Sequence, residues 1–283
     1  MAIIQLSIPT VMSLILHIPH SSTEIPEKAL GDYSIHKDEL ESITAYLSDL
    51  RTDELFDLRL RKTTIRFPWA RTYVDVERFL DRESMERLGM GAFYTQTPSG
   101  KLMREIDGSM REGLEKLYWQ HQNNVLRVCR RALDRHGHFL LIDCHSFPKE
   151  PFPWEDKSRP RPEFCIGHNG DYLGQEVAQS LKEDFVSYGH ACRTNTPFSH
   201  SYVPHALLDE IGSEDWTSVM IEVRRDLVEK RFEETKKVLE KVLRPVAKEF
   251  RDVRNQPIVL GEGEDYNTTQ TIGERQRLHS QGE

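Results

Sequence analysis

The segment His138-Phe139-Leu140-Leu141-Ile142-Asp143-Cys144-His145-Ser146 decides the fold class of this chain. Its apolar run, Phe139–Ile142, is continuous rather than alternating, which is typical of a sheet strand that is covered on both faces. The run ends in polar residues that can carry chemistry. Because side chains alternate along a strand, Asp143 and His145 share one face and Cys144 points to the other. This geometry argues against a catalytic dyad of Cys144 and His145.

Other apolar runs and amphipathic stretches extend this pattern along the chain. We expect strands over Leu14–Ile18, Thr72–Val76, Phe139–Ile142, Phe164–Ile166, Ala191–Arg193 and Ser218–Val223. Apolar residues spaced by three and four predict helices over Asp38–Leu50, Met110–Leu133, Tyr172–Phe185 and Leu227–Phe250. Residues 89–108, with their Gly, Ser, Thr and Pro, are typical of an excursion over the surface. Strands that alternate with helices indicate an α/β domain, which we place at residues 12–253, followed by a loosely ordered polar tail at residues 254–283.

The composition of the 283-residue chain argues against several classes of partner. Its formal net charge is -8 and its pI is about 5.9, whereas nucleic acids and anionic membranes reward clustered Lys and Arg. We find no apolar run that could span a membrane and no basic region of a signal peptide. The four cysteines match neither a Cys-x-x-Cys zinc site nor a small disulfide framework. We therefore expect a cytoplasmic protein whose partner is a small molecule.

Polar side chains gather where the expected strands end. They are His17 and His20, Glu77 and Arg78, Asp143 and His145, Asn195, and Glu222. In open α/β sheets, ligands bind in the crevice outside the carboxyl ends of the strands, so these residues are candidates for a single site. His145 is either a metal ligand with Asp143 in support, or a histidine that only caps the next turn.

A hydrolytic zinc site uses about three protein ligands, often two histidines and a carboxylate, and leaves a position for water. Pro19 excludes a helix at His17 and His20, so these two histidines are not a helical ligand pair. We favour His20, at the strand tip, as the ligand, and expect His17 to be a buried partner of a backbone carbonyl. The carboxylate is expected from Asp53 or, as a second choice, from Glu54, although Asp53 is equally consistent with an ordinary N-cap.

Two arginines and a glutamate complete the candidates. Arg78 closes an expected strand, where a planar guanidinium suits bidentate capture of a carboxylate, and Arg71 opens the same segment. The alternative role for either is a surface salt bridge. Glu222 interrupts an apolar strand, where a carboxylate is costly unless it is paired or used. It is either neutralised by Arg224 on the same face, or it is a general base whose pKa is raised by partial burial.

Five short signatures, taken in order, resemble the N-formylglutamate amidohydrolase family over residues 14–227. They are Pro-His-Ser around His20, Thr-Asp around Asp53, Arg-x-x-x-Asp-x-x-Arg from Arg71 to Arg78, Asp-x-His-Ser at Asp143–Ser146, and Asn-x-Pro-Phe at Asn195–Phe198 with a later Ile221-Glu222. The resemblance implies a single three-layer α/β domain of the zinc-carboxypeptidase type, with a mixed, mostly parallel central sheet flanked by helices. It also implies hydrolysis of the amide between a small acyl group and an amino acid.

The resemblance further implies a role for each candidate, carried over by position. The metal would be Zn²⁺ or another divalent ion, and Asp143 would orient its histidine ligand. The implied roles are metal ligands for His20, Asp53 and His145, general base for Glu222, carboxylate clamp for Arg78 with Arg71 also at the substrate, and walls of the substrate pocket for Asn195 and Tyr202.

The chain departs from the family pattern at two places near the substrate. Where the family has Asp-x-Asn-Arg, this chain has Asp75-Val76-Glu77-Arg78, and Glu77 adds a negative charge beside the clamp. Where the family commonly has Gly-Gly-Tyr, this chain has Ser199-His200-Ser201-Tyr202. The reaction class is therefore predicted more firmly than the acyl group or the amino acid, and the oligomeric state is not predicted. The alternative from another class is a catalytically inactive binding or regulatory protein on the same fold. A serine hydrolase has no Gly-x-Ser-x-Gly to support it.

Overall fold

A six-stranded mixed sheet forms the centre of the computed structural model, which describes residues 13–80, 84–170, 172–204, 207 and 215–248. The strands are β1 (Ser13–Ile18), β2 (Thr63–Arg66), β3 (Phe139–Phe147), β4 (Phe164–Gly167), β5 (Cys192–Thr194) and β6 (Trp216–Arg224). They lie in the order β2-β1-β3-β6-β4-β5, and every neighbouring pair is parallel except β6 with β4. This confirms the mixed, mostly parallel sheet.

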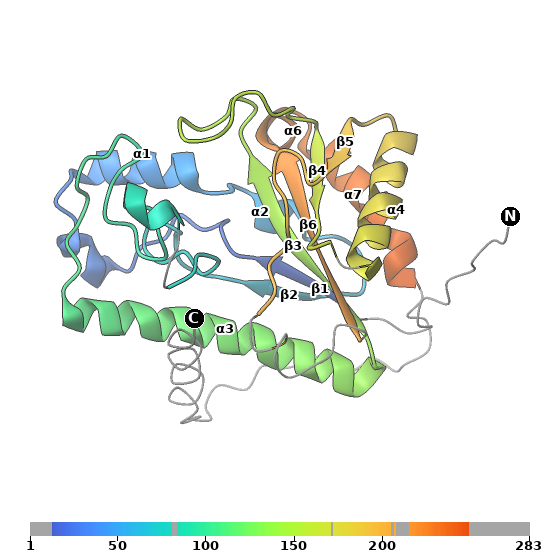
Figure 1. Ribbon diagram of the computed structural model, residues 1–283, viewed down its shortest axis with the longest axis horizontal. Helices are drawn as coiled ribbons and strands as arrows, with labels where there is room; N and C mark the ends of the chain where they lie inside the picture. Colours follow the sequence, from blue (N-terminus) through green and yellow to red (C-terminus); the bar gives the residue numbers. More distant parts are fainter. Residues whose placement is uncertain (1–12, 81–83, 171, 205–206, 208–214, 249–283) are drawn as a thin grey trace, which may run out of the picture.

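Helices cover both faces of the sheet, so the domain has three layers (Figure 1). The helices are α1 (Lys37–Leu47), α2 (Thr52–Leu55), α3 (Gly108–His136), α4 (Tyr172–Ser187), α6 (Arg225–Lys230) and α7 (Phe232–Lys248), with short 3₁₀ helices at Glu27–Asp32 and Ser84–Leu88. On one face, Leu140 and Ile142 of β3 pack with residues of α4, α6 and α7. On the other, Leu141 packs with Val125 and Cys129 of α3.

Strand β3 lies at the middle of this arrangement and is buried over all its residues. Its predicted apolar run needed cover on both faces, and the two hydrophobic clusters supply that cover. Cys144 belongs to the cluster under α4, α6 and α7, whereas Asp143 and His145 point to the other side of the strand. The predicted alternation at the end of β3 is therefore confirmed.

Several expected element boundaries differ from the observed ones. The helix expected over Asp38–Leu50 ends at Leu47, because Ser48 is extended, with φ -73° and ψ 153°. The helix expected from Leu227 to Phe250 is two helices, α6 and α7, separated at Arg231. Strand β2 was not expected, because it is an edge strand in which only Ile65 is buried and its apolar signal is short. The expected tail at residues 254–283 lies outside the described residues.

The strand expected over Thr72–Val76 is wrong. The segment is a series of turns, in which the amides of Tyr73 and Val74 both donate to the carbonyl of Ala70. Arg104, fully buried, donates 2.7 Å hydrogen bonds to the carbonyls of Tyr73 and Tyr94. A buried guanidinium thus satisfies carbonyls that a sheet ladder would otherwise have satisfied.

Residues 89–108 are also more than the expected surface excursion. Met90, Tyr94 and Met103 are buried in one hydrophobic cluster with Leu40 and Leu47 of α1, and Arg104 is fully buried. Within the described residues, no helix combines the length and apolar character that crossing a membrane requires.

Candidate active site

The register of the sheet brings the polar strand ends together. In the parallel pairing of β1 with β3, His17 lies opposite Asp143. In the pairing of β3 with β6, His145 lies opposite Glu222. His20 follows β1 by two residues, so three neighbouring strands deliver their polar residues to the same edge of the sheet. This agrees with the predicted position at the carboxyl ends of the strands.

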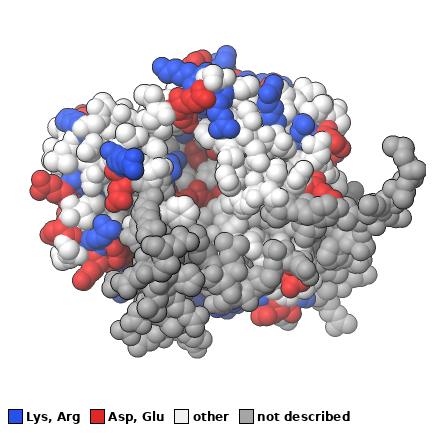
Figure 2. All heavy atoms as spheres, viewed as in Figure 1, with Lys and Arg blue, Asp and Glu red and all other residues white. Residues whose placement is uncertain are grey.

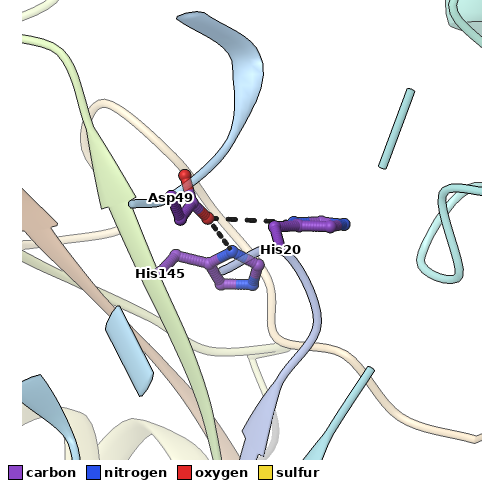
Figure 3. A group of neighbouring side chains, drawn as sticks. All are labelled: His20, Asp49 and His145. Atoms are coloured by element: carbon purple, nitrogen blue, oxygen red, sulfur yellow. Dashed lines mark hydrogen bonds and ion pairs between the residues drawn. The ribbon is translucent and has the colours of Figure 1, made fainter. Parts of the chain in front are cut away.

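The first group of side chains that could hold a metal ion is His20, Asp49 and His145 (Figure 3). One ligand atom from each lies within 4.8 Å of the others, and all three residues are buried. The Asp49 Oδ2 atom is 3.0 Å from His145 Nδ1 and 3.8 Å from His20 Nδ1. Two imidazoles and a carboxylate are the donor set of a catalytic zinc site with an open position.

Carboxylates behind the two histidines fix the orientation of their rings. The Nε2 atom of His20 is 2.9 Å from Asp75 Oδ1, and the Nε2 atom of His145 is 3.1 Å from Asp143 Oδ2. The Nδ1 atom of His20 is buried without a hydrogen-bond partner in the described part of the chain. If each Nε2–H donates to its carboxylate, both Nδ1 lone pairs are available beside Asp49, which is the usual arrangement around metal-ligating histidines. The residues present therefore fit a divalent cation.

Asp49 lies just after the end of helix α1, and its neighbours keep its carboxylate ionised. Its backbone amide donates to the carbonyl of His20, at 2.8 Å, and Arg225 Nη2 lies 3.2 Å from its Oδ1 atom. Burial alone would raise the pKa of Asp49, but the hydrogen bond and charge of His145, together with Arg225 and His20, lower it to about 2. A carboxylate in that state is ready to bind a cation at neutral pH.

Asp53, the carboxylate that the sequence favoured as a ligand, is not brought to the two histidines, and neither is Glu54. Asp53 forms an ion pair with Arg66 of β2. Glu54 pairs with Arg51, 3.1 Å away. Arg51 has a φ of 64°, so the chain turns sharply between Asp49 and helix α2 and carries the later residues away. Asp49 takes the position in the group that was expected for Asp53.

Asp49 was missed because the expected helix ran on to Leu50 and so covered it. On the expected helix, Asp49 comes two residues after Leu47, the last residue of the apolar stripe. Residues two apart do not share a helix face, so this spacing predicted an exposed side chain for Asp49.

A second buried group lies directly beside the first. The Nδ1 atom of His17 is 3.1 Å from Asp143 Oδ1 and 3.4 Å from Glu77 Oε1. Its Nε2 atom is 2.8 Å from His121 Nε2 on helix α3. His17 therefore contacts a carboxylate and an imidazole, and the expected bond to a backbone carbonyl is wrong. Glu77 Oε2 reaches back to the first group, at 3.2 Å from His145 Nε2.

Glu222 lies on β6 beside His145 with little exposure. Burial raises its pKa from 4.5 to about 8, against the charge of His145. Its Oε2 atom is buried without a hydrogen-bond partner among the described residues. Arg224, the expected neutralising partner, instead binds Asp226, with Nε 2.6 Å from Oδ1. The alternative in which Arg224 neutralises Glu222 is therefore wrong, and Glu222 is a buried carboxyl group that titrates near neutral pH.

The raised pKa of Glu222 predicts a dependence of stability on pH. The folded protein holds this proton more tightly than the unfolded chain does, so the free energy of unfolding falls as pH rises from about 4.5 through about 8. Every tenfold difference in proton affinity between the two states corresponds to about 1.4 kcal/mol. Urea unfolding of the metal-free protein at about pH 5.5 and about pH 8.5 measures the fall.

The matching variant is Glu222→Gln, which lacks the titrating group and should flatten this fall. His17 and His145, whose pKa values are also raised, contribute in the same direction in both proteins. The difference between wild type and variant therefore reports the contribution of Glu222 together with its interaction with His145. Equal changes in the two proteins would contradict the assignment.

The two arginines hold different positions around Asp75. Arg71 is mostly buried and donates from Nε and Nη2 to Asp75 Oδ2, at 3.1 and 2.8 Å. Tyr94 donates to the same oxygen at 3.2 Å. Arg78 is more exposed, at 30%, and its Nε is 3.8 Å from Asp75 Oδ2. Arg71 thus anchors the carboxylate that orients His20, and Arg78 lies further out.

Asn195 and Tyr202 lie in the segment between β5 and β6. Asn195 has a φ of 50°, and its Oδ1 accepts a 2.9 Å hydrogen bond from the amide of His168. The ring of Tyr202 stacks on His17 with centroids 4.7 Å apart, and its hydroxyl donates to Gln122 of α3. Tyr202 therefore packs against the second buried group, while Asn195 shapes the turn after β5.

One face of the molecule has a hollow (Figure 2). On the face shown in Figure 2, a hollow separates the part that carries α1 from the part that carries α6, and acidic side chains are visible on its floor. Basic side chains are seen on the rim above it. A cation would be drawn to the floor and a small anionic molecule to the rim.

Known proteins resemble this chain in sequence pattern and in fold. The family model described as N-formylglutamate amidohydrolase matches residues 12–229. The crystal structure of N-formylglutamate amidohydrolase from Ralstonia eutropha JMP134 superposes with a TM-score of 0.71 at 18% identity, covering 84% of this chain and 94% of that one. The structure of gene product Atu2144 from Agrobacterium tumefaciens gives 0.57 at 18% identity, covering 83% and 92%. A search among curated proteins gives no match.

Proposed function

This chain belongs to the N-formylglutamate amidohydrolase family, and from that premise we propose that it is a metal-dependent hydrolase of N-acyl amino acids. The scissile bond is the amide between a small acyl group, such as formyl, and the amino acid. The observation that carries the proposal is the buried group of His20, Asp49 and His145, which has Glu222 beside it in register on the next strand.

The cation is proposed to be held by His20, Asp49 and His145. When bound, it supplies a Lewis acid for the scissile carbonyl and for the attacking water. Zn²⁺ suits two imidazoles and a carboxylate, and the same donors accept manganese, cobalt or iron. Asp75 and Asp143 hold the two rings from behind, so they keep the ligand nitrogens in place.

Glu222 is proposed to be the general base. Its carboxylate accepts the proton of the attacking water, and the resulting carboxylic acid then protonates the leaving amine. Its burial and its raised pKa, about 8, support both steps, because a group that titrates near the working pH can accept a proton and return it.

Arg78 is proposed to bind the carboxylate of the amino acid. It is the more exposed of the two arginines that contact Asp75, and a guanidinium holds a carboxylate through two parallel hydrogen bonds. Arg71 is proposed to act through Asp75, which it holds, and Asn195 and Tyr202 to shape the wall of the pocket. Holding the substrate at its carboxylate fixes the acyl carbon over the reacting groups.

Replacing Arg78 with alanine is expected to raise KM about 10- to 100-fold, with a smaller change in kcat, because hydrogen bonds to a charged group are worth about 1.5–3 kcal/mol. Arg78→Lys should recover only part of the loss, since an ammonium cannot form the paired bonds. Steady-state kinetics on an N-formyl amino acid measure both. A KM unchanged in Arg78→Ala would remove Arg78 from the substrate.

A hydrolysis screen over N-formyl and N-acetyl amino acids tests the proposed reaction. The release of free amino acid from at least one of them, above a heat-denatured control, is the expected result. No release from any member of the set, by protein that contains its metal, would favour the alternative, an inactive binding protein on this fold. A cytoplasmic location is still our expectation, and the four buried, free cysteines are consistent with it.

A further inference from the structure

The second buried group, His17, Glu77 and Asp143, has its own metal-binding geometry. One ligand atom from each lies within 4.8 Å of the others. His17 is completely buried, and Asp143 and Glu77 are mostly so. The group lies directly beside the first, because Asp143 contacts His17 through Oδ1 and His145 through Oδ2, each at 3.1 Å.

Among the residues that the structure describes, the carboxylates of this second group form ion pairs with no cationic side chains other than imidazoles. In the described part of the chain, the ion pairs of Glu77 and Asp143 are all with histidines. Asp49 and Asp75, by contrast, each pair with an arginine. Buried carboxylates are costly unless a positive charge compensates them, and a divalent cation is a compensation that these residues can bind.

The two carboxylate oxygens of Glu77 face different groups: Oε2 faces the first group and Oε1 faces the second. Its Oε2 atom is 3.2 Å from His145 Nε2 and 3.6 Å from His20 Nδ1. Its Oε1 atom is 3.4 Å from His17 Nδ1 and is buried without a hydrogen-bond partner in the described residues. A carboxylate placed in this way is suited to bridge two cations, which in two-metal hydrolytic sites lie about 3.5–4 Å apart.

His121 gives His17 the orientation that a ligand needs. Its Nε2 atom lies 2.8 Å from His17 Nε2, so a hydrogen on His17 Nε2 can be donated to it. That tautomer leaves the lone pair of His17 on Nδ1, the atom that faces Glu77 and Asp143. The ring of Tyr202, stacked on His17, holds the imidazole from the side. These contacts are what is expected behind a ligand histidine.

We propose that the site binds two divalent cations, the second held by His17, Asp143 and Glu77, with Glu77 as the bridge. The proposal rests on the proposed function for the first cation and adds a second to it. The residue on which it depends is Glu77, whose two oxygens face the two groups. An amide in that position would not provide the second anionic oxygen.

The alternative is a hydrogen-bond network that only supports His145, with a single cation in the first group. The two cases differ in metal stoichiometry. Metal-free protein is dialysed against a modest excess of Zn²⁺, and bound zinc is measured by elemental analysis. We expect two equivalents for the wild type, one for Glu77→Asn and two for Asp53→Asn, which removes a carboxylate outside both groups.

One equivalent in the wild type, unchanged in Glu77→Asn, would overturn the second site and leave the proposed function intact. No bound metal in the wild type would overturn both. A second measurement uses the wild-type chain alone, so it does not depend on the folding of Glu77→Asn. Loaded with Mn²⁺, the wild type should show the exchange-coupled electron paramagnetic resonance spectrum of two neighbouring ions. The six-line spectrum of an isolated ion at saturating Mn²⁺ would contradict the bridge.

Discussion

Glu222→Gln is expected to lower kcat by about 10²- to 10⁴-fold, which is the contribution typical of a positioned general base. The glutamine fills the same space beside His145 but cannot accept a proton from water. KM should change little, because the role proposed for Glu222 is at the reacting water rather than at the carboxylate of the substrate. Bound metal should also remain, since Glu222 is not one of the ligands in the group formed by His20, Asp49 and His145.

Three measurements on this variant separate a chemical role from a structural one. They are kcat and KM on the best substrate of the screen, bound zinc, and the urea midpoint near pH 7. Glu41→Gln is a matched control, because Glu41 forms an exposed ion pair with Lys37 on helix α1. Wild-type turnover in Glu222→Gln would show that Glu222 is not the base. If the variant loses bound zinc together with its activity, Glu222 supports the metal site and is not shown to act as the base.

Asp49→Asn is expected to lose most of the bound metal and with it nearly all activity. The amide replaces the carboxylate that lies between His20 and His145. Replacing a residue that only holds a metal ligand from behind typically lowers metal affinity or activity by about 10- to 100-fold. Replacing a direct ligand should therefore lower activity by more than about 100-fold. Asp49 is also paired with Arg225, and the variant leaves that guanidinium with less compensation, so some stability should be lost as well.

Asp53→Asn is the matched control for Asp49→Asn. It makes the same chemical change four residues later, in a carboxylate that pairs with Arg66 at the surface. Metal content and kcat/KM are expected to stay close to wild type, because surface ion pairs contribute little. Elemental analysis and kinetics on the two variants compare the carboxylates directly. Retention of metal by Asp49→Asn, together with its loss in Asp53→Asn, would reverse the assignment made from the structure.

Most of the strands that could be predicted, β1, β3, β4 and β6, are nearly completely buried. The runs in β3 and β6 are apolar because both faces are covered, and the alternation at Asp143 and His145 follows from strand geometry alone. The segment Thr72–Val76 has the same apolar, β-branched character, but Arg104, from a distant loop, provides hydrogen bonds to its carbonyls. A long-range contact of this kind has no local signal in the sequence.

Parts of the candidate site were predictable for the same reason. His20, His145 and Glu222 stand at the ends of strands, and the parallel register brings them to one edge of the sheet. Asp49 was hidden because a helix boundary was expected three residues too late. His121 contacts His17 from the middle of helix α3, where a histidine in an amphipathic helix looks like any other buried polar residue.

Hydrolysis by the wild-type protein before and after removal of metal tests the central claim most directly. Protein treated with a chelator and then desalted should lose activity on its best N-acyl amino acid substrate. Stoichiometric Zn²⁺ should restore that activity, whereas Mg²⁺, which prefers oxygen ligands, should not. Activity that persists undiminished in protein shown to contain no metal would contradict a metal-dependent mechanism at His20, Asp49 and His145.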